Sequence, residues 1–414
     1  MDTIYRSVAG LDVHQKSITA CIRRTSKRGE AAEEVKSFGT MTRDLLALAD
    51  WMQSRDVTHV AMESTGVLWK PVYNVLEGLF ELLVVNPRDI KQVPGRKTDV
   101  TDSQWIAQLL ACGLLRSSFV PPRELRELRD LTRQRAQLVA ETTRETNRIH
   151  KVLEDANIKL GAVASDILGK SGRDMLQALV DGERDPEKLA DLARRRLRGK
   201  IPQLKLALEG RFTEHHCFML QKHLELLHYL ETQIEEFSVR IAEALRPFLT
   251  DDEFQRLDEA PGLDRRSIEN IIAEIGNDMG RFPSDDHVCS WGGISPGNNE
   301  SAGKRKGARL KPGNRWLRRA LSEAAWAASR TKDTYVAAKY RRLAGRRGKK
   351  RALMAVAHHL LKAIYHMLKH GVSYSELGAN YFDEHNRTHV ERYLVKRLEG
   401  LGYRVTLSPG DAAA

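Results

Sequence analysis

The sequence predicts an α/β domain followed by long helices and a basic, mainly helical C-terminal region. Residues 4–112 alternate strand-like and helix-like segments, and from about Pro121 the sequence becomes long, charged stretches with apolar residues at helical spacing. A third region begins at Asp251 and carries most of the excess positive charge. The 414 residues are enough for two or three domains, and 41% hydrophobic residues suit globular domains with real cores.

The expected N-terminal elements follow the order of three strands, then helix, strand, helix, strand and helix. The strands are expected over residues 8–12, 18–22, 35–38, 57–62 and 82–85. The helices are expected over 42–52, 68–79 and 99–110, the first with Thr42 as candidate cap and an apolar face of Leu45, Leu46, Leu48, Ala49 and Met52. This order is typical of an RNase H-like fold, which we therefore expect for residues 1–120.

Residues 121–250 predict a long helical spacer. A loose apolar stripe runs from Leu125 to Leu153, and a cleaner one alternates steps of three and four through Leu220, Leu224, Leu227, Leu230, Ile234, Phe237, Ile241 and Leu245. That period is typical of a coiled-coil or helical-hairpin seam. Residues 160–215 carry Gly, Asp and Arg clusters such as Arg194-Arg195-Arg196, and predict a small helical insert or the tip of the hairpin.

The charge of the chain indicates a polyanionic partner. The formal net charge is +12, from 67 Lys plus Arg against 55 Asp plus Glu, which fits nucleic acid first and an acidic membrane surface second. By count, residues 301–351 hold eighteen Lys or Arg and two acids. Helix formers are interspersed among these cations, so we expect a phosphate-facing helical surface within a basic domain, 251–385. The tail, 386–414, contains one strand-like piece from Tyr403 to Leu407.

Other features of the composition narrow the class of protein. The four cysteines, Cys21, Cys112, Cys217 and Cys289, lie far apart, which argues against a zinc knuckle or a disulfide framework and favours a reducing cytosol. Aromatic residues make up only 6%, too few for base-stacking platforms to dominate. The start has no apolar signal region, and no window reaches the length of a membrane span. We therefore expect a cytoplasmic, nucleoid-associated prokaryotic protein without a membrane partner.

Four acidic residues stand at the ends or starts of the expected elements. Asp12 ends the first strand, Glu63 ends the strand after the first helix, and Asp99 and Asp102 lie three apart at a helix start, so both can face one side. In the expected topology these elements meet at one edge of the sheet. Two-metal phosphoryl chemistry needs converging carboxylates around ions about 4 Å apart, and Mg²⁺ prefers oxygen ligands. Taken singly, each acid also fits an ordinary turn or a helix cap.

The third region contains a candidate phosphate-binding turn and a candidate nucleophile. The segment Ala260-Pro261-Gly262-Leu263-Asp264 resembles a helix-hairpin-helix turn, where backbone N–H groups approach a phosphate, and a plain helix pair fits equally well. Ser301 lies in a Gly-flanked loop beside Lys304, Arg305 and Lys306. A serine there could attack a phosphodiester while the cations stabilise the transition state, although most serines in such loops are simply loop residues.

Several motifs together resemble the DEDD transposases of the insertion-sequence one-ten (IS110) family. They are Gly-Leu-Asp12-Val-His, Met-Glu63-Ser-Thr-Gly and Lys-Thr-Asp99-Val-Thr-Asp102-Ser, followed by Pro261-Gly262, Arg281-Phe282-Pro283-Ser284 and Gly313-Asn314-Arg315. The resemblance covers roughly residues 5–155 and 255–340. It implies a RuvC-like α/β domain, a long α-helical coiled-coil spacer and a C-terminal transposase domain.

The resemblance also implies roles for individual residues and partners. Asp12, Glu63, Asp99 and Asp102 correspond to the family's metal-binding carboxylates, for which we expect two Mg²⁺ ions, and Ser301 to its nucleophile, with Ser295 as a nearby competitor. Family members pair a structured non-coding bridge RNA with donor and target DNA. The residues expected to bind nucleic acid are Lys97, Gly262, Lys304, Arg305, Lys306, Arg309, Lys311, Arg315, Arg318 and Arg319.

These expectations combine into one hypothesis with two rivals. The hypothesis is an RNA-guided recombinase that works through a covalent phosphoserine, as a dimer or tetramer joined by the coiled coil, with an active site that can be composed from two subunits. One rival is a RuvC-like junction nuclease that uses water as nucleophile and leaves Ser301 structural. The other is a non-enzymatic nucleic-acid-binding scaffold in which the acids only cap turns.

Overall fold

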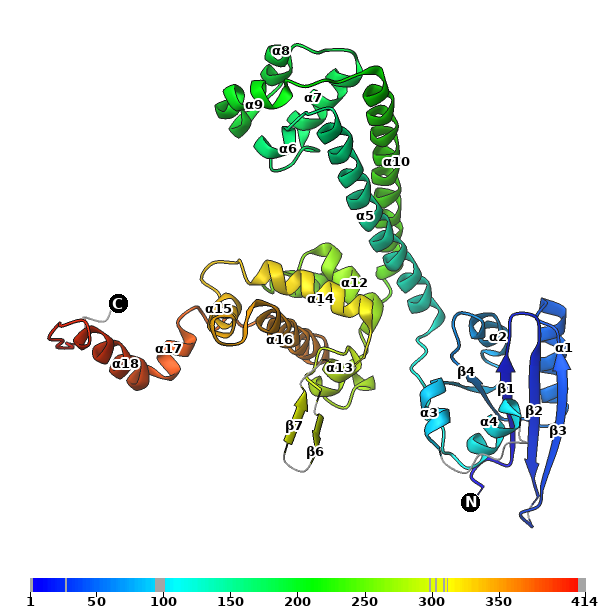
Figure 1. Ribbon diagram of the computed structural model, residues 1–414. Helices are drawn as coiled ribbons and strands as arrows, with labels where there is room; N and C mark the ends of the chain where they lie inside the picture. The colour runs from blue at the N-terminus through cyan, green and yellow to red at the C-terminus, as the bar shows by residue number, and fades with distance from the viewer. Residues whose placement is uncertain are drawn as a thin grey trace. The chain divides into compact units, whose positions relative to one another are not determined.

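The chain divides into two compact units, unit 1 (Met1–Pro122) and unit 2 (Arg123–Ala414), shown in Figure 1. The computed structural model describes residues 3–26, 28–93, 101–297, 299–301, 304–307, 310 and 312–408. Within those ranges, none of the helices combines the length and the apolar character that crossing a membrane requires.

Unit 1 is a mixed five-stranded sheet with helices on both faces, as expected of an α/β domain. The strand order is β3-β2-β1-β4-β5, with β1 antiparallel to β2 and parallel to β4, and β4 parallel to β5. The strands are β1 Ser7–Val13, β2 Ile18–Thr25, β3 Ala31–Phe38, β4 His59–Glu63 and β5 Glu81–Val85. The helices are α1 Thr42–Gln53, α2 Trp69–Leu76, α3 Pro87–Gln92 and α4 Asp102–Ala111.

The two faces of this sheet carry separate hydrophobic clusters. Alternate residues of β1 and β4, including Leu11 and Met62, pack with α1 and α2 on one face. The residues between them, Val8 and Ala61, pack with α4 on the other face. Both central strands are therefore buried on both sides, which is why they read as nearly continuous apolar runs.

Three local expectations in unit 1 were wrong in detail. Met41, rather than Thr42, is the N-terminal cap of α1, and the helix takes Thr42 as its first residue. Leu46 does not belong to the apolar face, since it is 52% exposed, whereas Trp51 is buried there and donates a hydrogen bond to Glu34. The helix expected over 68–79 is shorter, because Glu77 already has extended backbone and Gly78 has a φ of 83°.

Unit 2 begins with a long antiparallel pair of helices, α5 (Arg123–Asp155) and α10 (Glu214–Leu245). The apolar stripes of both helices pack within the chain, with Leu138 of α5 against Leu230 and Ile234 of α10. Four short helices and a 3₁₀ helix lie between the ends of the pair: α6 Leu160–Val163, α7 Lys170–Val180, α8 Pro186–Asp191, the 3₁₀ helix Arg195–Lys200 and α9 Ile201–Leu208. Their own core includes Met175, Leu176 and Leu204.

The rest of unit 2 is a helical domain with one small hairpin of strands. Its elements are α11 Asp251–Asp258, α12 Arg265–Ile275, a 3₁₀ helix Met279–Arg281, α13 Asp285–Trp291, β6 Asn299–Ser301, β7 Lys304–Gly307, α14 Arg315–Ala328, α15 Tyr335–Arg347, α16 Lys349–His370, α17 Tyr381–His385 and α18 Arg387–Glu399. The strand expected from Tyr403 to Leu407 is wrong. This segment has no regular structure, and Tyr403 and Leu407 are 65% and 61% exposed, so their alternation has no sheet to pack against.

Candidate catalytic and nucleic-acid-binding sites

Asp12 and Glu63 lie at the carboxyl ends of neighbouring parallel strands. The register of β1 and β4 pairs Gly10 with Ala61 and Leu11 with Met62, so its continuation sets Asp12 beside Glu63. Because side chains alternate along a strand, both carboxylates share the face of the sheet that α4 covers. The expected meeting of these two acids at one sheet edge therefore agrees with the strand register.

Helix α4 brings a third carboxylate toward this edge because Gly10 has no side chain. A Cβ atom at Gly10 would lie 2.2 Å from the Ser103 carbonyl oxygen and 2.4 Å from the Ala107 nitrogen. The first turn of α4 thus packs directly against β1 at Gly10, which stands two residues before Asp12. Asp102 is the first residue of that helix, after the capping residue Thr101. Asp99 and Lys97 lie outside the described residues.

The immediate partners of two of these acids were not anticipated from the sequence. The imidazole Nε2 of His14 lies 3.1 Å from Asp12 Oδ2, and the Thr65 hydroxyl donates to Glu63 Oε1. Both residues stand two positions after their acid, within the quoted motifs, which is the signal that could have identified them. Among the described residues, no group of three or more His, Cys, Asp or Glu side chains is arranged closely enough to hold a metal ion.

Ser301 lies at the end of a two-stranded hairpin in unit 2. It is the last residue of β6 and pairs across the hairpin with Lys304, the first residue of β7, while Glu300 pairs with Arg305. The backbone therefore places a cationic residue directly opposite the candidate nucleophile. Lys306, like Lys304, belongs to β7. Ser295 precedes the hairpin and is half-buried. Arg309 and Lys311 lie outside the described residues.

The base of this hairpin is closed by two glycines in contact. A Cβ atom on Gly313 would lie 2.4 Å from the nitrogen of Gly293, and one on Gly293 would lie 2.8 Å from the Gly313 Cα. Gly293 also has a φ of 67°, which favours glycine. The segment that leads into the hairpin and the segment that leads out of it can approach this closely only because Gly293 and Gly313 have no side chains.

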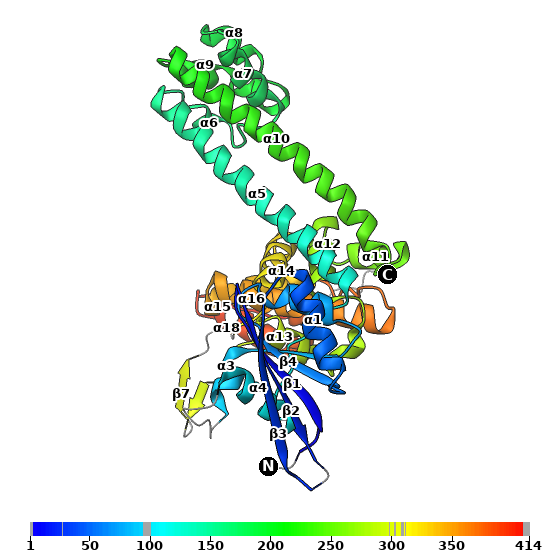
Figure 2. The same cartoon turned by 90° about the vertical axis from the view of Figure 1, so that its right-hand side faces the viewer.

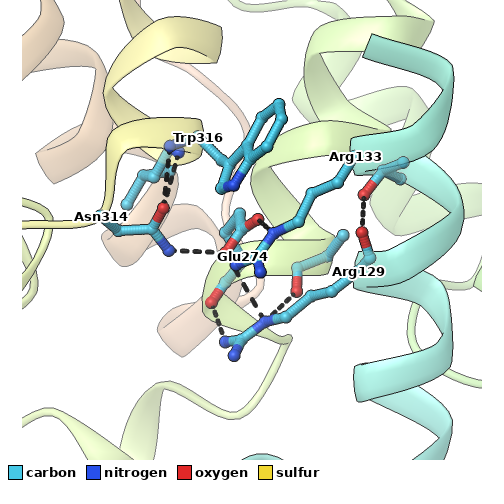
Figure 3. A network of polar contacts seen from close by, with 8 residues as sticks. Arg129, Arg133, Glu274, Asn314 and Trp316 are labelled. Carbon is cyan, nitrogen blue, oxygen red and sulfur yellow. Dashed lines mark hydrogen bonds and ion pairs between the residues drawn. The ribbon is translucent and has the colours of Figure 1, made fainter. Parts of the chain in front are cut away.

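A buried polar network ties the helix after the hairpin to α5 and α12 (Figure 3). The carboxylate of Glu274, 2% exposed, accepts two hydrogen bonds of 2.8 Å from Arg133 and one from the Asn314 amide, and forms an ion pair with Arg129. Asn314 in turn caps α14 by accepting from the backbone N–H groups of Trp316 and Leu317. Burial lowers the pKa of Arg129 to about 10.

The three arginines expected on α14 have different surroundings. Arg315 is exposed and lies over the Trp316 ring at 5.0 Å, and Arg319 donates to Glu323 at 2.9 Å. Arg318 is half-buried, with its guanidinium next to the position of Gly293. The opposite face of the helix, including Leu317 and Leu321, is buried. Arg315 and Arg319 therefore lie on the outer side of α14, whereas the Nε atom of Arg318 is buried.

A cavity of about 350 Å³ lies between α5, α12 and α14. Its lining includes the cationic side chains of Arg133, Arg135, Arg266 and Arg319. Gly262 lies at its edge. A Cβ atom there would be 2.3 Å from the Ala324 carbonyl oxygen, and its φ is 81°. Close packing against α14 therefore already requires this glycine, whether or not its turn contacts a phosphate.

Comparison with known families then decides the class of protein. A family model for DEDD transposases of the IS110 type matches residues 9–158, and a model described as "Transposase IS116/IS110/IS902 family" matches residues 254–341. Together these ranges cover more than half of the 414 residues. The chain belongs to the IS110 family of DEDD transposases. No curated protein matches it in a sequence comparison.

Membership of this transposase family gives the carboxylates a context, because DEDD transposases generally use divalent metal ions. Asp12, Glu63 and Asp102 of the transposase offer the oxygen donors that a hard divalent cation prefers. The absence of a side chain at Gly10 lets α4 approach the strand that bears Asp12. The described acids therefore supply the donor type that a divalent cation takes at the carboxyl ends of β1 and β4, although among the described residues they do not form a group of three close enough to hold an ion.

Proposed function

We propose that this IS110-family transposase is an RNA-guided, Mg²⁺-dependent recombinase that cuts and rejoins DNA through a covalent phosphoserine. The observation that carries the metal part of the proposal is the register of β1 and β4, which sets Asp12 beside Glu63 under the start of α4. Such an arrangement is expected of an RNase H-like, RuvC-like domain. In this proposal Asp99 and Asp102 complete the carboxylate set.

Ser301 is the proposed nucleophile. Its Oγ attacks a phosphorus of the DNA backbone and loses its proton, a serine–phosphate ester bond forms, and the bond from phosphorus to one deoxyribose oxygen breaks. That oxygen takes up a proton and leaves as a hydroxyl. A hydroxyl of the other DNA strand then attacks the phosphorus of this ester and loses its proton, and the bond from phosphorus to Ser301 Oγ breaks. The serine oxygen takes up a proton and is released as a hydroxyl, so that one phosphodiester is restored for the one that was broken.

Cations and carboxylates stabilise the charge of this reaction in different ways. Lys304, which pairs with Ser301 in the backbone register of the hairpin, would offset negative charge on the attacked phosphate. Mg²⁺ bound to the carboxylates would polarise phosphate oxygens and favour the ionised nucleophile. Arg315, Arg318 and Arg319 would hold the DNA backbone along α14.

Guidance by a bridge RNA and assembly into a dimer or tetramer complete the proposal. The sequence shows no recognisable base-reading motif, so delegation of sequence choice to base pairing would account for a basic protein of this kind. The apolar seam of α5 and α10 packs within one chain, and α10 also exposes Phe218, Leu226 and Tyr229, which could join a second chain as the coiled-coil contact.

The deciding experiment is a search for a covalent protein–DNA adduct on a denaturing gel. The wild type, Ser301→Ala and Asp12→Ala would be incubated with Mg²⁺, DNA of the element's ends and its flanking transcript. We expect an adduct in the wild type that both substitutions abolish, and no recombination without the transcript. If Ser301→Ala still cuts DNA and Asp12→Ala does not, the serine is structural and the protein is a hydrolytic RuvC-like nuclease.

A further inference from the structure

The helical insert at the far end of the α5–α10 pair contains a second, separate cavity. Its volume is about 650 Å³, and the loop before α7, the start of α7 and the 3₁₀ helix Arg195–Lys200 line it. No aromatic, Asn or Gln side chain lines it. It therefore has no aromatic ring for stacking on a base and no amide for reading a base edge.

Five cations but only one carboxylate line this cavity. The cations are Lys170, Arg194, Arg195, Arg196 and Lys200, and the carboxylate is that of Asp166, which accepts a backbone hydrogen bond from Leu168. Two of the five have partners within the insert, because Arg194 pairs with Asp174 at 2.7 Å and Lys200 donates to the Val163 carbonyl.

The other three cations have no ion-pair partner among the described residues of the chain. Lys170, Arg195 and Arg196 are exposed, and Lys170 begins α7, whose cap, Gly169, provides no side-chain acceptor for the first N–H groups. The positive end of that helix thus opens on the same cavity as the three cations. Elsewhere in the insert, away from the lining of this cavity, the lysines have partners, since Lys188 pairs with Glu183 and Lys205 pairs with Glu187.

Arg195 also has a backbone conformation that a large side chain rarely adopts, with a φ of 50°. Tight packing fixes the surrounding backbone: the Arg194 N–H donates to the Ser171 hydroxyl, and Gly172 leaves no room for a Cβ beside the Ile167 carbonyl. The fold thus maintains a strained arginine at the rim of a cationic cavity, where a glycine or asparagine would be more stable.

We propose that this cavity binds the phosphodiester backbone of a nucleic acid without reading its sequence. Clustered Lys and Arg side chains, a serine hydroxyl and an uncapped helix start are the groups that contact phosphates in protein–nucleic acid complexes. The cavity is remote from the helices around Glu274, because about twenty residues of α5 separate Arg135 from Asp155, roughly 30 Å of helix. The insert is thus a second, distal anchor on DNA or structured RNA for the transposase.

The test measures binding of the full-length protein to a labelled 60-bp DNA duplex of arbitrary sequence and to a structured RNA of similar size, over a range of salt concentrations. The variant Arg195→Glu/Arg196→Glu should bind about tenfold or more weakly, with a salt dependence reduced by about one to two counterions. The matched control, Lys188→Glu/Lys205→Glu, changes the net charge equally in the same insert and should lose less than threefold.

A second variant, Arg195→Gly, separates binding from folding. It removes one cation and relieves the positive φ, so it should melt at the same or a higher temperature than the wild type and still bind more weakly. A loss confined to the duplex identifies DNA as the ligand, a loss confined to RNA identifies RNA, and loss of both identifies a general backbone site. Equal losses in the cavity and control variants, or none in either, would overturn the proposal.

Discussion

The removal of the Glu274 carboxylate should loosen the start of α14 more than any single change on the surface of that domain. Glu274 is 2% exposed and binds Arg129, Arg133 and Asn314, which belong to α5 and to the N-terminal cap of α14. Glu274→Ala leaves two guanidinium groups without their carboxylate and removes one acceptor of the capping Asn314. The change therefore acts on both the helical pair and the segment that follows the Ser301 hairpin.

The structure sets the magnitude of this effect. Removal of one partner from a buried ion pair costs about 3–5 kcal/mol. Two observations favour the lower end: Arg129 keeps hydrogen bonds to the backbone carbonyls of Ala273 and Glu274, and the Arg133 side chain is 31% exposed and can turn toward water. The lost bond to Asn314 adds about 1 kcal/mol. We expect a total of about 4 kcal/mol, and roughly half of that for Glu274→Gln, which keeps the volume and an acceptor oxygen.

Amide hydrogen exchange in the full-length protein measures this effect locally, which suits a protein of two units. Amides of α12 and of the first turns of α14 should exchange more than a hundredfold faster in Glu274→Ala, since each 1.4 kcal/mol is a factor of ten. The control is Glu323→Ala on α14. Its partner Arg319 and Glu323 itself are 42% and 59% exposed, so the loss should stay below about 1 kcal/mol.

Two results would refute this reasoning. If Glu274→Ala and Glu323→Ala accelerate exchange equally, the buried network contributes no more than an ordinary surface pair. If Glu274→Gln is as damaging as Glu274→Ala, the loss stems from disturbed packing rather than from the unpaired guanidinium groups. The intermediate effect of glutamine is therefore the specific signature of the network.

Three further predictions concern unit 1 and the core of unit 2. Gly10→Ala should destabilise unit 1 by about 1–3 kcal/mol in urea unfolding, because its Cβ would overlap the Ser103 carbonyl, and a wild-type midpoint would contradict the packing. Burial lowers the pKa of His359 to about 4. This stability contribution is therefore fully present above about pH 6.5, and about 3 kcal/mol is lost as the pH falls toward 4, because the unfolded chain takes up the proton first. His359→Gln should show a flatter pH dependence of the melting temperature. Chelation of divalent ions should abolish DNA cleavage, as should Asp12→Asn or Glu63→Gln, with the melting temperatures of the two variants close to that of the wild type; cleavage that survives chelation would exclude the metal proposal.

Much of unit 1 could be predicted from the sequence because its signals are local. A strand buried on both faces reads as an apolar run, and both Asp12 and Glu63 stand where such a run ends. The errors arose where the decision depends on tertiary contacts. Leu46 matches the helical spacing but points to water, and Trp51 is buried because it reaches Glu34 on β3. The hydrogen bond between Trp51 and Glu34 cannot be predicted from the spacing of apolar residues along the sequence.

The residues of the candidate site were predicted from motifs, and their roles stay a prediction. The side chains that contact the acids were not predicted: His14 and Thr65 were missed although they lie within those motifs. Glu274 gave no signal at all, since an acid in an amphipathic helix normally faces water. Its burial depends on two arginines that precede it by more than 140 residues, and only the fold brings them together.

In both units, glycines allow the close backbone contacts that place the elements bearing the candidate polar residues. Gly10 lets α4 lie on the strand that bears Asp12, Gly262 lets the turn before α12 lie on α14, and Gly293 with Gly313 closes the hairpin of Ser301. At each point a helix or loop backbone occupies the place of a Cβ atom, and that neighbour cannot yield as a flexible side chain could. An alanine at these positions therefore moves a whole element with its polar residues, whereas neutralising an exposed arginine on α14 removes one contact. The substitution that looks mildest in the sequence is the more disruptive one in the structure.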